Sequence, residues 1–536
     1  MNKQKNRDWI KDAVIYQIYP QSYYDSNGDG IGDLQGIIKK LDYIKSLGVN
    51  LIWLNPCFES PFNDAGYDVS DFYKIAPRYG TNKDMATLFK EAHKRDLRVC
   101  LDLVAGHSSI EAEWFQQSTK VKKNKYSNYY IWSDSWDVKP RGGNSIRGYG
   151  QRNGNFLINF FWNQPALNYG YANPDPNLPW EEAVTGKGPK AVIAELKNIM
   201  KYWLDMGCDG YRVDMAASLI KNDHSRKKVI KLWNSNLHPW IRKSYPSAIM
   251  IAEWGDPTKA VAGAGFDVDF FLHCGVPGYG EMFFNHQAVC GRKIKKACYF
   301  DIAGKGSPKK FLNEYFKHYK KVKGKGFISI PTANHDFQRM NWGRSDQELK
   351  IIYTFIFTWI GIPTLYYGDE IGMRFIPGLP SKEGAYTRTG SRTPMQWSKE
   401  KNSGFSKGKE TNLYLPLDPD KKRPDVLSQE KNSGSLLNFT RRLIELRNTI
   451  PALRNDGDIK VLSIEGASYT LVYQRSMGNK KYLIALNPSS KKAEFQLKIK
   501  VNSFELIMGS GVKLLSGLKA SVKISGQSYA IFKIEQ

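Results

Sequence analysis

Residues 34–56 read LQGIIKKLDYIKSLGVNLIWLNP, and this stretch joins a helical pattern to a buried strand. In residues 34–48 the apolar side chains recur with helical spacing, and Gly48 is a typical helix end. Residues 49–56 are almost continuously apolar, as in a parallel strand that is covered on both faces. A similar strand pattern precedes them at 13–20, and a helix (82–96) and a strand (97–104) follow. This order predicts a parallel α/β sheet.

The same strand pattern recurs further along the chain, at 209–216, 247–254, 266–272, 326–333 and 361–368. Together with 13–20, 49–56 and 97–104 these segments make about eight strands, the number that closes a (β/α)8 TIM barrel. We therefore predict a barrel built from residues 1–107 and 173–456, including a long loop at 369–433 after the last strand. The rhythm is broken by 108–172, which predicts an inserted subdomain, and residues 457–536 alternate like a C-terminal antiparallel β-sandwich.

The composition is that of a globular protein, with 536 residues, 41% of them hydrophobic. No run of about 18 apolar residues occurs, so we expect no membrane span. The N-terminus lacks the apolar core of a signal peptide, and we expect a cytoplasmic protein. The six cysteines form no CxxC pair and lie mostly in apolar runs, which predicts buried free thiols rather than disulfides.

The net charge of +26 raises the question of a polyanionic partner. Lysines and arginines cluster at 120–125, 292–296 and 309–326. No zinc, helix-turn-helix or RNA-binding signature accompanies them, so we interpret the clusters as solvated surfaces and expect no nucleic-acid partner.

Charged and polar side chains gather at the ends of the predicted strands. In chain order they are Asp102, His107, Arg212, Asp214, Glu253, His335 and Asp336. The carboxyl ends of barrel strands build the active site of such folds. One carboxylate there could be a structural ion pair, but several acids, two histidines and an arginine on one rim indicate a catalytic cleft.

Acids on neighbouring strands fit retaining glycoside hydrolysis, which needs two carboxyl groups about 5–5.5 Å apart. Asp214 and Glu253 end consecutive strands, and Arg212 points to the same face as Asp214 and would keep it ionised. Glu253 precedes Trp254 in an apolar context that favours a protonated acid. Asp336 is positioned to bind sugar hydroxyls and support the developing positive charge.

These residues resemble the α-amylase family, glycoside hydrolase family 13. The resemblance is carried by DLVAGH (102–107), GYRVD (210–214), IAEW (251–254) and ANHD (333–336), in the order of the family. It implies Asp214 as nucleophile, Glu253 as acid/base and Asp336 as transition-state stabiliser. It also implies sugar contacts around the first subsite from His107, Arg212, His335, Tyr67 and Asp68, the last two within AGYDVSDF (65–72).

The segment DSNGDGIGDL (25–34) alternates oxygen-bearing side chains around Gly30, like the first part of an EF-hand loop. The twelfth position, which needs a glutamate in an EF-hand, is Gly36. Within the resemblance the segment is similar to a structural metal loop of the oligo-1,6-glucosidase and trehalose-synthase branches. That similarity implies calcium, or sometimes magnesium, held by Asp25, Asn27, Asp29, the Ile31 carbonyl and Asp33. A plain Asx-rich turn is the alternative.

The branch of the family is less defined. NQPALNYG (163–170), SRTPMQW (391–397) and NSGF (402–405) resemble oligo-1,6-glucosidases, α-glucosidases, sucrose-acting enzymes and trehalose synthases. In those relatives the arginine matching Arg392 pairs with the aspartate matching Asp68 and closes the pocket. Gly106 and Met215 depart from the usual residues at their positions, so the linkage preference stays open.

Three functions remain open from the sequence. The first is a retaining α-glucosidase or α-amylase-type hydrolase of short α-glucans. The second is a transglycosidase or sugar isomerase that uses the same covalent intermediate, and the third is an inactive carbohydrate-binding relative. Each implies an oligosaccharide or disaccharide partner, and the oligomeric state stays undetermined.

Overall fold

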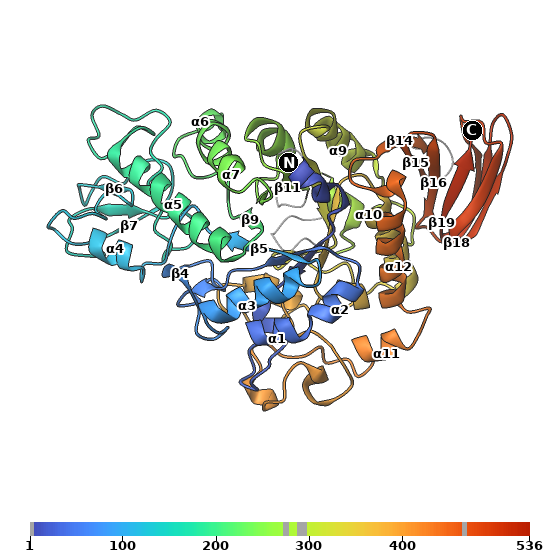
Figure 1. Cartoon of the computed structure of the whole chain (residues 1–536), viewed down its shortest axis with the longest axis horizontal. Helices are drawn as coiled ribbons and strands as arrows, with labels where there is room; N and C mark the ends of the chain where they lie inside the picture. Colours follow the sequence, from blue (N-terminus) through green and yellow to red (C-terminus); the bar gives the residue numbers. More distant parts are fainter. Residues whose placement is uncertain (1–4, 272–277, 287–296, 464–468) are drawn as a thin grey trace.

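The structure, a computed structural model, describes residues 5–271, 278–286, 297–463 and 469–536. A closed barrel of parallel strands forms its centre (Figure 1). In order around the barrel the strands are β1 (Ile15–Ile18), β2 (Leu51–Leu54), β5 (Arg98–Leu103), β9 (Gly210–Val213), β10 (Ile249–Ala252), β11 (Val268–Phe270), β12 (Phe327–Pro331) and β13 (Ile362–Tyr366). The predicted TIM barrel is confirmed, although Leu272, at the end of the predicted sixth strand, lies outside the described residues.

Alternate side chains of the barrel strands belong to two separate cores. One cluster includes Ile15, Trp53, Cys100, Ile251 and Val268. Their neighbours along the strands belong to a second, larger cluster that also contains the helices. Because successive strand residues face opposite sides, the first cluster fills the barrel interior and the second packs beneath the helices.

The register of the barrel places two charged residues in this interior. Asp102 lies two residues after Cys100 on β5, and it pairs directly with Arg212 on β9. Both side chains therefore point inward near the carboxyl ends of their strands.

The main helices are α1 (Leu34–Lys39), α2 (Leu41–Ser46), α3 (Asn82–His93), α5 (Lys187–Met206), α6 (Lys227–Leu232), α7 (His238–Ser244), α9 (Lys309–Val322), α10 (Asp346–Thr358) and α12 (Leu436–Thr449). Shorter ones are α8 (Tyr279–Phe283) and α11 (Val426–Glu430). The single helix expected at 34–48 is interrupted at Lys40, whose φ is −105° and ψ 6°. The Lys40 amide bonds to the Ile37 carbonyl three residues earlier at 3.0 Å, and this tighter turn separates α1 from α2.

The loops contain short 3₁₀ and π turns in addition. They are η1 (Lys5–Asp12), η2 (Pro20–Ser22), η3 (Trp233–Leu237), η4 (Thr258–Gly263), η5 (Asp369–Ile371), η6 (Tyr386–Ser391), η7 (Lys401–Gly404), η8 (Glu410–Asn412) and η9 (Pro451–Leu453). η5 to η8 all belong to the long loop after β13, so this loop is ordered by local turns rather than by long elements.

Between β5 and α5 the chain leaves the barrel and forms a small subdomain, which lies at the far left of Figure 1. It contains α4 (Glu113–Ser118) and an antiparallel sheet of β6 (Trp132–Ser133), β8 (Asn155–Leu157) and β7 (Ser145–Arg147), in that order. Phe115 packs against Trp132 and Phe156 with ring centroids 5.8 Å and 4.8 Å away. Aromatic side chains of this segment thus form its core. A separate hairpin, β3 (Phe58–Glu59) with β4 (Asp71–Ile75), follows β2.

The C-terminal strands form an antiparallel domain at the opposite end of the molecule (Figure 1). They are β14 (Asp458–Ser463), β15 (Leu471–Met477), β16 (Lys480–Asn487), β17 (Ala493–Gln496), β18 (Ser503–Leu515) and β19 (Ser521–Glu535). All belong to one hydrogen-bonded sheet, because the long β19 pairs with β16, β17 and β18. Residues such as Tyr473 and Ile531 join the barrel core, whereas Val522 and Phe532 belong to a separate cluster within the domain.

Cys57, Cys100, Cys208 and Cys298 are buried free thiols, and Cys274 and Cys290 lie outside the described residues. In the described part of the chain, no helix combines the length and the apolar character that crossing a membrane requires.

Candidate active site

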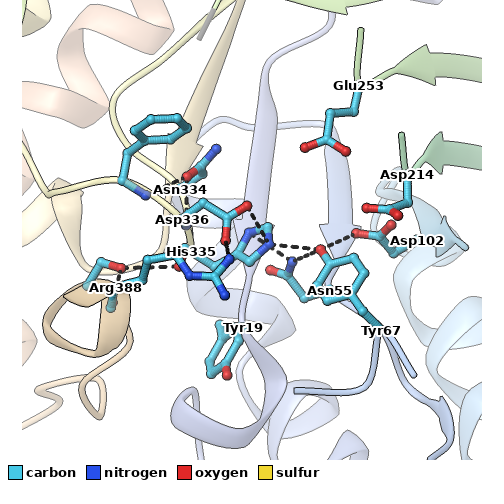
Figure 2. Close-up of polar contacts among 12 residues, drawn as sticks. Tyr19, Asn55, Tyr67, Asp102, Asp214, Glu253, Asn334, His335, Asp336 and Arg388 are labelled. Carbon is cyan, nitrogen blue, oxygen red and sulfur yellow. Dashed lines mark hydrogen bonds and ion pairs between the residues drawn. The ribbon is translucent and has the colours of Figure 1, made fainter. Parts of the chain in front are cut away.

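The acids expected at the strand ends converge at one mouth of the barrel (Figure 2). The amide of Asp214 bonds to the Leu103 carbonyl at 2.9 Å, and the amide of Glu253 bonds to the Val213 carbonyl at 3.0 Å. Each residue thereby continues the hydrogen-bond ladder by one step beyond its strand. The strand ladder therefore holds the two backbones side by side.

Arg212 is the charged centre of this site. Its guanidinium contacts Asp102 at 2.8 Å, Asp214 at 3.0 Å and Glu253 at 2.9 Å. The Arg212 side chain is almost fully buried, so these attractions are only weakly screened by water. One permanent cation thus contacts three carboxyl groups, and its position on the same face as Asp214 is the one expected from the sequence.

The protonation pattern differs from the one expected. Burial, and then the negative charge of Glu253, raise the pKa of Asp214 well above its usual range, although Arg212 opposes both effects. Glu253 accepts hydrogen bonds from the Met215 amide at 2.9 Å and from Arg212 at 2.9 Å. The apolar environment predicted for Glu253 is therefore wrong, because its oxygens face donors. A hydrogen bond between the two carboxyl groups also raises the pKa of Asp214.

Asp336 faces these acids and has the opposite electrostatic setting. It contacts Arg388 at 2.6 Å, Arg392 at 3.3 Å and His335 at 3.3 Å. Burial alone would raise the pKa of Asp336, but these neighbours lower it well below its usual range. Asp336 is thus an anion near pH 7. Arg388 was not singled out from the sequence, since a lone arginine in a long loop carries no recognisable pattern.

Tyr67 and His335 form a stacked pair beside Asp102, with ring centroids 5.5 Å apart. The Tyr67 hydroxyl donates to Asp102 at 3.0 Å and lies 2.8 Å from His335 Nε2. On the other edge of the ring, His335 Nδ1 lies 3.0 Å from Gln17 Nε2 and 3.1 Å from Asn55 Nδ2. Because amide nitrogens only donate, Nδ1 is the acceptor and the ring proton sits on Nε2. Gln17 and Asn55 are further site residues that the sequence did not reveal.

His107 is buried and its Nε2 lies 3.1 Å from the Tyr67 carbonyl. Burial lowers the pKa of His107 to about 3, and the same cause lowers the pKa of His335 to about 3. Both rings are therefore neutral near pH 7. They therefore add no charge to the site.

The expected ion pair between Asp68 and Arg392 does not form. Asp68 accepts hydrogen bonds from Ser60 Oγ at 2.9 Å and the Asn63 amide at 2.8 Å, which fold its own loop. Arg392 instead donates to the His335 carbonyl at 2.8 Å and lies 3.3 Å from Asp336. Donors within its own loop already form hydrogen bonds with Asp68, so Asp68 does not need an arginine as a partner.

Arg388 takes the role that we expected for Arg392. Its guanidinium spans Asp336 and, at 3.9 Å, Asp64. Asp64 also accepts from Gln164 at 2.7 Å, and burial raises the pKa of Asp64 to about 7 while Arg388 opposes that rise. The loop after β13 is thus joined across the site to the loop after β2 through a different arginine and a different acid.

A cavity of about 470 Å³ contains these groups. Its floor is formed by Asp214, Glu253 and Asp336, and its walls include Tyr67, His107 and Arg388. The size falls in the range of small-molecule sites. A second cavity of about 440 Å³ lies at the other end of the barrel, beside the start of β12, and contains none of these groups.

Aromatic side chains surround the entrance of the active-site cavity. Phe160, Phe161, Phe337 and Tyr386 line it, and the ring centroids of Phe161 and Tyr386 are 5.9 Å apart. Phe160 and Tyr386 are 52% and 62% exposed, which is unusual for large apolar side chains and typical of a surface that stacks on sugar rings. In the sequence, only the high share of aromatic residues, 13%, indicated that such a surface could exist.

The loop at 25–34 satisfies its carboxylates internally. Asp25 accepts from the amides of Gly28 at 2.7 Å and Gly30 at 2.8 Å, and Asp29 accepts from the Ile31 amide at 2.8 Å. Asp33 caps α1 by accepting from the Gly36 amide at 2.6 Å. Across the described residues, no group of three or more His, Cys, Asp or Glu side chains is placed to share a metal ion. The oxygen donors suit calcium chemically, but here they serve as Asx turns, so metal binding stays a prediction.

The comparison with known proteins agrees with this barrel. The family model for the α-amylase catalytic domain matches residues 17–456, so the chain belongs to the α-amylase family. It is an enzyme of that family, with glycoside hydrolase and transglycosylase relatives.

Three relatives illustrate the range. The oligo-1,6-glucosidase of Parageobacillus thermoglucosidasius is 30% identical, covering 92% of each chain. A trehalose synthase/amylase of Mycolicibacterium smegmatis is 29% identical, covering 82% of this chain and 76% of its own. The crystal structure of isomaltulose synthase from Erwinia rhapontici superimposes with a TM-score of 0.80 and 26% identity, covering 98% of this chain and 99% of that one. Hydrolases and isomerases are thus both among the similar proteins.

Proposed function

We propose that the protein is a retaining α-glucosidase that removes terminal glucose from short α-glucans. The observation that carries this proposal is the cavity lined by Asp214, Glu253 and Asp336, across which Arg388 joins the loop after β13 to the loop after β2. A chain-end substrate needs such a pocket, whereas cleavage within long chains needs a groove open at both ends. The relatives that act on α-1,6-linked glucosides support the same substrate class.

In the proposed reaction, a glucosyl unit stacks on Tyr67 with its anomeric carbon above Asp214. Glu253 donates its proton to the glycosidic oxygen as that bond breaks, and an Asp214 oxygen forms the new bond to the anomeric carbon. Asp336, kept anionic by its arginine neighbours, stabilises the positive charge that develops on the sugar ring. Glu253 then takes a proton from water, and the resulting hydroxide equivalent displaces Asp214 to release glucose.

The proposed roles require an ionised Asp214 and a proton on Glu253 when the reaction begins. Burial and Glu253 raise the pKa of Asp214, whereas Arg212 opposes that rise and stabilises the ionised Asp214 from 3.0 Å. Arg212 is therefore the residue on which the nucleophile depends.

A second candidate is a glucosyl transferase or sugar isomerase. It is favoured by the aromatic entrance, since Phe160, Phe161 and Tyr386 can hold a leaving sugar and exclude water from the covalent intermediate. In that case the released sugar, such as fructose from sucrose, attacks the intermediate through another hydroxyl.

A product profile with maltose, isomaltose, sucrose and soluble starch tests both candidates. We expect free glucose from maltose or isomaltose, and release of glucose units alone from starch. A disaccharide isomer formed from sucrose would favour the second candidate. Early release of mixed long oligosaccharides from starch would contradict a pocket for chain ends and both proposals.

We also propose, from the resemblance of its sequence, that the loop at 25–34 binds one structural calcium ion through Asp25, Asn27, Asp29, Asp33 and the Ile31 carbonyl. The ion would add cross-links between turns that otherwise rely on Asx hydrogen bonds. Chelation should then lower the melting temperature more than it lowers activity at room temperature. If the melting temperature is the same in excess calcium and in excess chelator, the loop is an Asx turn alone.

A further inference from the structure

Gly106 has no side chain although its backbone does not require glycine. Its φ is not in the left-handed region, where glycine is favoured. A Cβ atom built on Gly106 would lie 2.7 Å from Asn159 Nδ2, and 3.6 Å from the Leu219 side chain. The space beside Gly106 is therefore filled by the amide of Asn159, which comes from the inserted subdomain after β8.

The orientation of the Asn159 amide is determined by Lys221. The Lys221 ammonium lies 3.2 Å from Asn159 Oδ1 and 3.2 Å from the Ser218 carbonyl. An ammonium can only donate, so the amide oxygen has to face it. Lys221 is 5% exposed, and burial lowers its pKa to about 8, so it is still mostly cationic near pH 7.

With its oxygen turned to Lys221, Asn159 presents its NH₂ group to His107. Asn159 Nδ2 lies 3.0 Å from His107 Nδ1, which must then be the acceptor. The ring proton is left on Nε2, which donates to the Tyr67 carbonyl at 3.1 Å. The chain from Lys221 through Asn159, together with the Tyr67 carbonyl on the other edge, thus determines both the tautomer and the plane of a ring that lines the active-site cavity.

The same amide also contacts the residue that follows the nucleophile. Asn159 Nδ2 lies 3.7 Å from Met215 Sδ, and the Met215 amide donates to Glu253 at 2.9 Å. The two positions at which this chain departs from the α-amylase pattern, Gly106 and Met215, therefore meet at Asn159. One side chain from the inserted subdomain reaches both edges of the site.

We propose that Asn159 is a positioning residue that fixes His107 as the Nε2–H tautomer facing the sugar subsite. Lys221 orients the Asn159 amide, and the absence of a side chain at Gly106 leaves space for it. The effect on turnover rests on the proposed function, whereas the tautomer does not. Asn159 itself touches no reacting atom.

Two substitutions test the chain from opposite sides. Asn159→Asp keeps the shape but turns the donor into an acceptor, so His107 Nδ1 should become protonated. Gly106→Ala should displace the Asn159 amide, since the flexible end of that side chain can move. Asn177→Asp, at an exposed position, and Gly143→Ala, whose new Cβ would lie no closer than 3.5 Å to its neighbours, are matched controls.

The first readout is the ¹⁵N spectrum of histidine-labelled protein, with the His107 signals assigned by their loss in His107→Gln. The wild type and both controls should show His107 with an unprotonated Nδ1 and a protonated Nε2, and Asn159→Asp should show a protonated Nδ1. A wild-type Nδ1 that carries a proton, or an unchanged spectrum in Asn159→Asp, would overturn the proposal. This readout holds even if no glucosidase activity is found.

The second readout is kcat/KM for an aryl α-glucoside. Asn159→Asp and Gly106→Ala should each lower it about fivefold to tenfold relative to their controls, the scale of one well-placed hydrogen bond. Equal kinetics in variants and controls would show that the contact is structural only. Melting curves identify any variant that fails to fold. Lys221→Met then takes the place of that variant, because without the ammonium the Asn159 amide can turn over and the His107 signals should shift.

Discussion

The Arg212 guanidinium contacts three carboxyl groups, so contact with Arg212 does not by itself distinguish the roles of these acids. Substitution of each acid in turn does. Asp214→Asn should remove the nucleophile, and Glu253→Gln should remove the proton donor. Each should lower turnover of an aryl α-glucoside by several orders of magnitude, since no other group can form or protonate the bond. Asp134→Asn, at a carboxylate that is 58% exposed in the inserted subdomain, is the control. Retention of more than a tenth of wild-type turnover in either variant would refute the assignment.

Arg388 gives a prediction about pH at the same scale. Its charge, 2.6 Å from Asp336, lowers the pKa of that acid together with His335 and Arg392. A group with a depressed pKa is ionised above that pKa and loses its charge as the pH falls through it. Arg388→Gln should raise the pKa of Asp336, so activity should be lost at a higher pH on the acid side.

The measurement is the pH profile of kcat/KM on the acid side for Arg388→Gln and for Arg442→Gln, an exposed control on α12. The acid limb of Arg388→Gln should move upward and that of Arg442→Gln should coincide with the wild type. An unmoved acid limb would mean that Arg388 does not set the charge of Asp336.

At the scale of elements, the roof of the cavity is the turn that leads into η6. Glu383 and Tyr386 have φ values of 47° and 50°, which are strained for residues other than glycine. Glu383 is held by Arg78 at 2.8 Å and 3.1 Å and by the Tyr414 hydroxyl at 2.8 Å. These bonds offset the strain and hold Tyr386 over the cavity entrance.

Glu383→Ala should therefore loosen the roof without touching the floor. We expect a higher KM for maltose, a smaller change in kcat, and more hydrolysis relative to transfer, because water enters more easily. Glu410→Ala, at an exposed position of the same loop, is the control. Equal KM and equal product ratios in the two variants would show that the turn is not a roof.

For the whole molecule, buried Arg475 joins the C-terminal domain to the barrel, and buried Arg447 lies on the barrel side. Arg475 on β15 donates to the carbonyls of Thr358 and Arg454, each at 2.6 Å, and Arg447 on α12 donates to that of Phe357 at 2.7 Å. Within the described residues neither arginine has a carboxylate at ion-pair distance, and burial lowers the pKa of Arg447 to about 9. Backbone carbonyls at the end of α10 and in the following loop accept the hydrogen bonds that carboxylates would otherwise accept.

Arg475→Met should leave several buried carbonyls without donors and lower the free energy of unfolding by about 3 kcal/mol or more. Lys480→Met, exposed on the neighbouring β16, should be close to neutral. Urea unfolding followed by circular dichroism measures both. A loss below about 1 kcal/mol for Arg475→Met would show that the carbonyls find other donors.

The barrel and the acids at its strand ends were predictable because their signals are local. A strand covered on both faces is apolar throughout, and Asp214 and Glu253 follow such runs directly. The break at Lys40 was not predictable, because the helical pattern continues through it. The same holds for Arg388, Gln17 and Asn159, which carry no pattern of their own and come from loops or from distant strands.

Sequence by itself therefore determined the class of fold, the strands and the acids at their ends, since apolar periodicity and residue order decide these locally. Only the tertiary structure decided which arginine meets which acid and how His107 is oriented. Asp68 had backbone donors within five residues of its own position, whereas Asp336 received Arg388 and Arg392 from a loop more than fifty residues away. Such pairings depend on distances between loops that are set by the packing of the entire barrel, and no pattern along the chain encodes them.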